Sequence, residues 1–197
     1  MAAAPPAGSF DDIETARLLL RLVPPEAVEA GLAGDLDRCA ELLGAHVPVD
    51  LREAPTVLVY AKARLDEDPL YQPWSMRALV DKQTMAMVGH IRFHTRPDPD
   101  YLRPYAAQAV ELGYEVFASH RRQRYASEAM QGVMQWARER HDVHRFIATV
   151  SPDNLPSLTL ISRFDFRKIG EHMDPVDGLE GIYLRDETEK GPSLRSG

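Results

Sequence analysis

The sequence predicts a single domain of the α/β (α+β) class. Its 197 residues can bury a sizeable core, and 44% hydrophobic with 27% charged residues is an ordinary globular mixture. Apolar runs typical of strands alternate with stretches of helical periodicity, and neither an internal repeat nor a second domain is visible. We expect the domain to occupy residues 11–186, between disordered tails at 1–10 and 187–197.

The first half of this domain is expected to consist of one strand followed by helices. The apolar run at residues 15–23, with interspersed arginines, predicts the strand. Pro25 opens a helix that runs to about Gly34, and Asp35 can cap the next one. Residues 56–65 predict a third helix, and the proline-rich, acidic segment 66–73 predicts a loop.

Strands and helices alternate in the second half. Two apolar runs at 75–80 and 84–94 predict a β-hairpin, and three prolines make 95–107 an irregular excursion. The next strand, at 109–117, contains Gly113, where a bulge is plausible. The remaining predicted elements are a helix at 125–140, a strand at 145–150, a helix at 155–164 and strands at 166–170 and 181–184.

Composition excludes several classes of function. A net charge of −7 argues against a nucleic-acid partner, and a single cysteine excludes an intrachain disulfide and a cysteine-based zinc site. No apolar run is long enough to span a bilayer, and no signal peptide is visible, so we expect a cytoplasmic protein without a membrane partner. His90 and His94 would lie about 13 Å apart on one strand, too far for one metal ion, and no metal site is expected.

Short motifs in the second half carry a family resemblance. V-E-L-G-Y at 110–114 leads into H-R-R-Q-R-Y-A-S-E-A at 120–129, followed by N-L-P-S at 154–157 and S-R-F-D-F at 162–166. This series resembles the GNAT superfamily of acetyl-CoA-dependent N-acetyltransferases. In the branch that includes ribosomal-protein N-terminal acetyltransferases, the blocks read E-I/L-G-Y, Y-R-G-x-G-Y-A-S/T-E-A, N-x-x-S and E-K-L-G-F. The resemblance implies the GNAT fold, a mixed and mostly antiparallel central sheet flanked by helices.

The segment after the strand at 109–117 is suited to bind an anion. A strand that passes through a short loop into a helix leaves several unpaired backbone N–H groups at the helix start, with the helix dipole behind them. The resemblance implies that this anion is the pyrophosphate of acetyl-CoA, the expected co-substrate. The cofactor-binding residues it implies are Val116, Ala118, Arg121, Arg122, Gln123, Arg124, Tyr125, Ala126, Ser127 and Asn154.

Three positions depart from the family pattern. Arg122 and Arg124 replace the two glycines of the loop, and Asp165 replaces a glycine before the last strands. Glycine takes φ > 0 freely and lets the backbone approach the phosphates, and we expect arginine to do neither. Two interpretations stay open: the arginines pair with phosphate around a surviving N–H cradle, or their side chains block the site.

Glu111 is the candidate general base for an amine acceptor, acting directly or through water. The alternative is that Glu111 pairs with an arginine across the sheet. Ser157 or water is the candidate acid, because Ile161 stands where many relatives have a tyrosine. Asn154 and Ser157 fit hydrogen bonds to the pantetheine arm, and equally a helix start capped by Asn154.

Two functions therefore compete. The first is acetyl transfer from acetyl-CoA to a primary amine, of a protein N-terminus or a small molecule. The second is a degenerate GNAT domain that binds a ligand or another protein without turnover. A homodimer would be unsurprising in either case.

Overall fold

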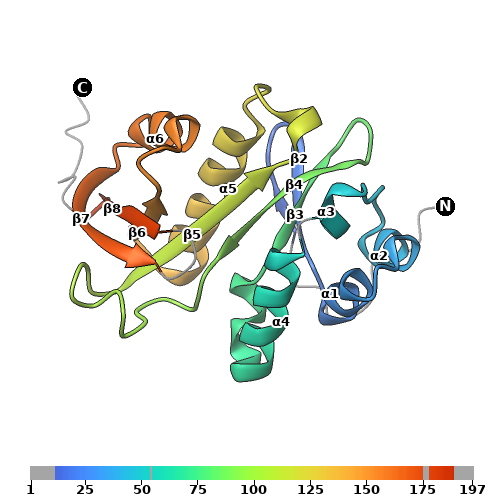
Figure 1. The fold of residues 1–197 in the computed structure, drawn as a ribbon, viewed down its shortest axis with the longest axis horizontal. Helices are drawn as coiled ribbons and strands as arrows, with labels where there is room; N and C mark the ends of the chain where they lie inside the picture. Colours follow the sequence, from blue (N-terminus) through green and yellow to red (C-terminus); the bar gives the residue numbers. More distant parts are fainter. Residues whose placement is uncertain (1–11, 54, 175–177, 189–197) are drawn as a thin grey trace, which may run out of the picture. The chain divides into compact units, whose positions relative to one another are not determined.

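The computed structural model describes residues 12–53, 55–174 and 178–188 (Figure 1). Its fold is the mixed α/β class that the sequence predicts, with an eight-stranded, mostly antiparallel sheet flanked by helices. Tails are expected at 1–10 and 187–197, and of these residues 1–10 and 189–197 lie outside the described residues. At Glu187, the backbone N–H donates to the carbonyl of His144 at 2.9 Å, and the carboxylate accepts from Arg138 at 2.9 Å.

The chain divides into two compact units. The first comprises the described residues up to Thr95 together with Tyr114–Val133, and the second comprises Arg96–Gly113 and the described residues from Met134 onward. The strand β5 (Ala109–Val116) and the helix α5 (Tyr125–His141) contribute residues to both units.

Four strands of the first unit pair antiparallel in the order β1-β2-β3-β4. They are β1 (Ile13–Glu14), β2 (Leu18–Leu22), β3 (Arg77–Asp81) and β4 (Met87–Phe93). Pairing of β3 with β4 confirms the predicted hairpin. The strand predicted at 15–23 is wrong at its start, because Thr15 to Arg17 form the turn between β1 and β2.

The helices of the first unit begin where local chemistry favours them. They are α1 (Pro25–Leu32), α2 (Leu36–Leu43), α3 (Asp50–Glu53) and α4 (Thr56–Glu67). The Asp35 side chain accepts from the Arg38 N–H at 2.9 Å, which confirms the predicted cap of α2. The loop predicted at 66–73 contains a 3-10 helix, Pro69–Trp74, because Asp68 caps the N–H of Leu70. Val28, Leu58, Met76, Ala78 and Val80 belong to this unit's core.

The strands of the second unit follow the order β5-β6-β8-β7. β6 (Arg145–Val150) runs parallel to β5, whereas β8 (Gly178–Asp186) pairs antiparallel with β6 and with β7 (Arg167–Asp174). Both last strands are longer than predicted. The helix α6 (Leu155–Ser162) follows β6. Leu102, Ala109, Ile147 and Ile182 form a buried cluster in this unit. Among the described helices, none combines the length and apolar character needed to cross a membrane.

Candidate functional site

The loop between β5 and α5 carries most of the predicted cofactor-binding residues and belongs to the first unit. A single 3-10 turn, Ala118–His120, begins it. Val116 is half-buried, Ala118 and the four residues Arg121, Arg122, Gln123 and Arg124 are exposed, Tyr125 is buried, and Ala126 and Ser127 are half-buried. The Glu128 N–H closes the first helical bond to the carbonyl of Arg124 at 3.1 Å. The N–H groups of residues 125–127 therefore have no acceptor within the helix.

Arg122 and Arg124 both adopt the left-handed backbone conformation, each with φ of 65°. The expectation that arginine would not take a positive φ here is wrong. An L-residue other than glycine pays about 1–2 kcal/mol for this conformation, because Cβ crowds the following carbonyl oxygen. The loop thus holds, with two arginines, a backbone shape that glycine adopts without cost.

The three arginines of the loop use their side chains differently. Arg121 Nε donates to the carbonyl of Val116 at 3.0 Å, and its guanidinium lies 3.9 Å from the Glu115 carboxylate. Arg121 therefore ties the loop back to the strand that precedes it. Within the described residues, the guanidinium groups of Arg122 and Arg124 take part in no hydrogen bond or ion pair. Their charges are available to an external anion.

Gly89 of β4 fixes the strand end from which the loop departs. A Cβ atom on Gly89 would lie 2.2 Å from the carbonyl oxygen of Glu115 and 2.9 Å from Cα of Val116. Next to this contact, the Phe117 N–H donates to the carbonyl of Val88 at 3.0 Å. The close approach of two backbones therefore requires glycine at this position.

His90, the neighbour of Gly89, adds a polar contact to the same strand end. Its Nε2 lies 3.5 Å from the carboxylate of Glu115, and the residue is only 3% exposed. Burial lowers the pKa of His90 below its usual value, which favours the neutral ring. The hydrogen bond with His90 lowers the pKa of Glu115, which keeps its carboxylate ionised and attractive to Arg121.

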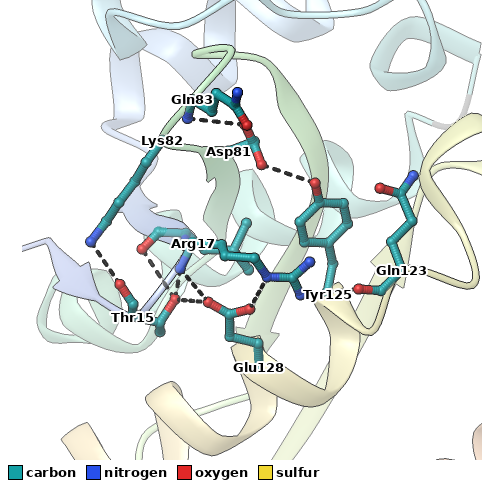
Figure 2. A network of polar contacts seen from close by, with 9 residues as sticks. Thr15, Arg17, Asp81, Lys82, Gln83, Gln123, Tyr125 and Glu128 are labelled. Atoms are coloured by element: carbon teal, nitrogen blue, oxygen red, sulfur yellow. Dashed lines mark hydrogen bonds and ion pairs between the residues drawn. The ribbon is translucent and has the colours of Figure 1, made fainter.

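A network of polar contacts holds the other end of the loop, at the start of α5 (Figure 2). The Glu128 carboxylate accepts from Thr15 Oγ1 at 2.6 Å and from the backbone N–H and Nε of Arg17 at 2.6 and 2.8 Å. The Tyr125 hydroxyl donates to Asp81 at 2.9 Å. Sequence reasoning did not identify the partners of Glu128. Arg17, a basic residue directly before the apolar run of β2, is the sequence signal that could have indicated one of them.

The predicted base, Glu111, lies in the second unit and is 4% exposed. One carboxylate oxygen accepts from Thr149 Oγ1 at 2.6 Å and the other from the Tyr101 hydroxyl at 2.8 Å. Thr149 belongs to β6, and Tyr101 belongs to the excursion between β4 and β5. A buried carboxylate needs such donors to offset its lost hydration. Sequence reasoning missed both hydroxyls, because neither neighbours Glu111 in the chain.

Asn154 and Ser157 meet at the start of α6, also in the second unit. The Asn154 side chain accepts from the Ser157 N–H at 3.2 Å, which confirms the predicted cap. Asn154 is exposed, Ser157 is half-buried, and Ile161, at the position of the missing tyrosine, is buried. The cap uses the Asn154 side-chain oxygen and leaves its amide nitrogen as a group that a ligand could use.

A group of metal-ligand type that the sequence did not suggest lies on the β7–β8 hairpin. Within the described residues, ligand atoms of His172, Asp174 and Glu180 lie within 4.8 Å of one another. His172 Nε2 is 3.6 Å from the Glu180 carboxylate, so these side chains already form an ion pair when the histidine is protonated. Acidic side chains commonly gather at surfaces in this way without a bound ion.

Solved structures share this fold. RimL, a ribosomal L7/L12 α-N-protein acetyltransferase crystallised with coenzyme A, superimposes with a TM-score of 0.62 at 19% identity, over 89% of this chain and 98% of that one. RimJ of Mycobacterium smegmatis, in complex with a CoA disulfide, gives 0.61 at 18% identity, over 93% and 90%. At these identities the likeness concerns the fold alone.

Sequence comparison supports the same family. The chain is 27% identical to an uncharacterized N-acetyltransferase of Bacillus subtilis, YnaD, over 43% of this chain and 45% of the relative. It is 25% identical to another, YoaA, over 82% and 85%. The chain thus spans about half the length of YnaD and most of YoaA. The model of the "Acetyltransferase (GNAT) domain" matches residues 17–167, most of the chain, and the protein therefore belongs to the GNAT acetyltransferase family.

Proposed function

We propose that this protein transfers an acetyl group from acetyl-CoA to a primary amine, of a protein N-terminus or a small molecule, by direct attack in a ternary complex. One observation carries the proposal. Arg122 and Arg124 hold a backbone conformation that glycine adopts readily, and their guanidinium groups have no hydrogen bond or ion pair within the part of the chain that the structure describes. Strained backbone conformations persist mostly where they serve a function, so two of them beside exposed arginine side chains favour a loop that still binds an anion.

The cofactor-binding roles follow from this loop. The N–H groups of Tyr125, Ala126 and Ser127, which have no acceptor within the helix, would donate hydrogen bonds to the pyrophosphate oxygens, aided by the positive end of the helix dipole. Arg122 and Arg124 would add charge-assisted hydrogen bonds to the phosphate oxygens. Asn154 would bind the pantetheine arm through its amide nitrogen, and Ser157 stands beside it at the start of α6.

Glu111 would act as the general base. The amine nitrogen attacks the thioester carbonyl carbon, the carbon–sulfur bond breaks, and the amine's proton passes to the Glu111 carboxylate. Ser157 or water protonates the departing thiolate. The Tyr101 hydroxyl donates to one oxygen of Glu111, and Tyr101 is 47% exposed. The proton taken up by Glu111 would therefore pass through the Tyr101 hydroxyl to solvent.

The degenerate domain is the second candidate. Two loop arginines in place of glycine and Ile161 in place of a tyrosine favour it, because each removes a feature of the family's usual machinery. In that case the domain would bind a ligand or another protein without turnover.

A product screen separates the two. The purified protein is mixed with acetyl-CoA and a panel of amines, comprising peptides with free N-termini, amino sugars and amino acids. Release of coenzyme A is followed together with the mass of each amine. A gain of 42 Da on any amine, dependent on enzyme, supports acetyl transfer, since acetylation replaces one hydrogen by C₂H₃O. Acetyl-CoA binding without product on the whole panel would favour the degenerate domain, and absence of acetyl-CoA binding would contradict acetyl transfer and favour the degenerate domain too.

A further inference from the structure

Arg17 makes contacts on both sides of the strained residue Arg124. It lies in the turn between β1 and β2, more than 100 positions from the loop in sequence. Its Nη2 donates to the carbonyl of Gln123 at 3.0 Å, and its guanidinium lies over the ring of Tyr125, 4.6 Å from the centroid. Gln123 and Tyr125 immediately flank Arg124. One side chain therefore holds the residue before and the residue after the left-handed position.

Glu128 of the helix α5 holds the Arg17 guanidinium in place. Its Nε donates to one oxygen of Glu128 at 2.8 Å, while the Arg17 backbone N–H and Thr15 Oγ1 share the other oxygen (Figure 2). Burial alone would raise the pKa of Glu128, but hydrogen bonds from Thr15 and Arg17 outweigh it and the pKa lies below its usual value. Glu128 is thus an ionised anchor that orients Arg17 toward the loop.

The Tyr125 ring is held at its other end as well. Its hydroxyl donates to Asp81, whose other oxygen accepts from the N–H groups of Gln83 and Thr84 in the turn after β3. The ring therefore offers Arg17 a fixed surface, and a cation over an immobile aromatic face is a favourable contact.

We propose that Arg17 is the positioning residue that holds the loop 121–126 in its anion-binding shape now that arginine has replaced glycine at position 124. A glycine loop would adopt this shape unaided, whereas a loop with arginine there needs an external clamp on its flanking residues. The inference rests on the proposed binding of acetyl-CoA, and it assigns Arg17 no contact with the cofactor.

The test is calorimetric titration with coenzyme A in two backgrounds. Arg17→Met keeps an unbranched side chain in place of the arginine stem but removes the guanidinium, while Thr15 and the backbone N–H of residue 17 can still bind Glu128. In the natural sequence, Arg17→Met should weaken coenzyme A binding roughly tenfold or more, since charge-assisted hydrogen bonds are lost. In the Arg124→Gly background, the same change should weaken binding less than about threefold, because glycine needs no clamp.

Arg21→Met is the matched control. Arg21 lies four residues further along, in β2, and binds Asp12 at 3.0 Å and the carbonyl of Leu43; among the described residues, none of its hydrogen bonds or ion pairs involves the loop. Coenzyme A affinity should be unchanged in this variant. If Arg17→Met unfolds the protein, the same comparison is made with Arg17→Lys, which keeps the charge but cannot contact Gln123, Tyr125 and Glu128 together.

Two results would overturn the inference while leaving the proposed function intact. One is unchanged affinity in Arg17→Met, and the other is an equal loss in both backgrounds, which would mean that Arg17 does not act through the strained residue. Failure of the unaltered protein to bind coenzyme A would instead overturn the proposed function, and this inference with it.

Discussion

The loop between β5 and α5 and the surroundings of Glu111 place charged side chains in opposite environments. The loop exposes two arginines whose side chains have no partner among the described residues, and it keeps their backbones in a costly conformation. Glu111 is buried on an ordinary strand, and a hydroxyl donates to each of its oxygens. Charge is offered to solvent in one region and enclosed in the other.

This difference follows from what each region would have to do. A phosphate site gains from donors that are fixed in place and still available, so strain and unpaired charge are tolerable there. A general base gains from orientation and from partial removal of water, which require neighbours that fix the carboxylate. Under the proposed function, the loop would supply affinity for the cofactor and Glu111 would carry out the chemical step. Variants that change one property and leave the other level test this separation.

The largest effect is expected at Glu111. Glu111→Gln keeps the shape and can still accept from Thr149, but it cannot take a proton. We expect kcat to fall by roughly 10²–10⁴ while acetyl-CoA affinity stays level, as for loss of a general base. Steady-state kinetics and calorimetry measure the two quantities. Glu139→Gln, at an exposed carboxylate of α5 that binds Gln135, is the control and should change neither. Equal losses of kcat and of acetyl-CoA affinity in Glu111→Gln would contradict the assignment of affinity to the loop and of the chemical step to Glu111.

Gly89→Ala should damage the loop without touching Glu111. The added Cβ would lie 2.2 Å from a backbone oxygen of the first unit, so the strand end must shift. We expect a loss of about 1–3 kcal/mol in the free energy of unfolding, as for overpacking of a core, with weaker coenzyme A binding. Denaturant unfolding measures the stability. Gly170→Ala is the control, because its nearest new contact would be 3.4 Å and its effect should be small. Wild-type stability in Gly89→Ala would contradict the close approach.

Arg124→Gly should move stability and affinity in opposite directions. Glycine relieves the left-handed strain, about 1–2 kcal/mol before the added freedom of the unfolded chain is subtracted, so stability should hold or rise. Loss of the guanidinium should weaken coenzyme A binding by about 1–3 kcal/mol if it pairs with phosphate. Tighter binding would show instead that the side chain blocks the site. Arg163→Gly, where the arginine has an ordinary φ of −71°, should only destabilise.

The smallest effect concerns pH and the strand end before the loop. His90 has a pKa lowered by burial from the usual 6.5, so the unfolded chain binds a proton at a higher pH than the folded one. Stability should therefore fall as the pH drops below 6.5, down to the folded pKa. Melting temperatures between pH 8 and pH 5 should show this decline, and His90→Gln should flatten it. An identical decline in the variant would assign it to other groups.

The fold was predictable because its signals are local. The helix starts at Pro25, Asp35 and Asn154 and the hairpin at 75–94 depend on neighbouring residues, and the structure confirms them. The partners of Glu111 and Glu128 were not predictable, since each joins segments far apart in the chain. The predicted strand at 15–23 includes the turn before β2, because no glycine or proline separates Thr15 and Arg17 from the apolar run that follows them.

The positions of the replaced glycines carry the most instructive error. Arg122, Arg124 and Asp165 stand where the family has glycine, and all three have positive φ, of 65°, 65° and 60°. Residue type alone indicated that a positive φ would be costly at these positions. The structure nevertheless holds a positive φ at all three, as tertiary structure can when it outweighs a local preference.

The most direct test of the retained loop compares coenzyme A with pantetheine, which lacks the pyrophosphate, on the unaltered protein. Calorimetry and melting temperature are measured for each, with dephospho-CoA as a third ligand. Coenzyme A and dephospho-CoA should bind and raise the melting temperature in proportion to saturation, whereas pantetheine should do little. No heat and no shift at millimolar coenzyme A, or equal binding of pantetheine, would contradict the claim that the arginine loop still holds the pyrophosphate.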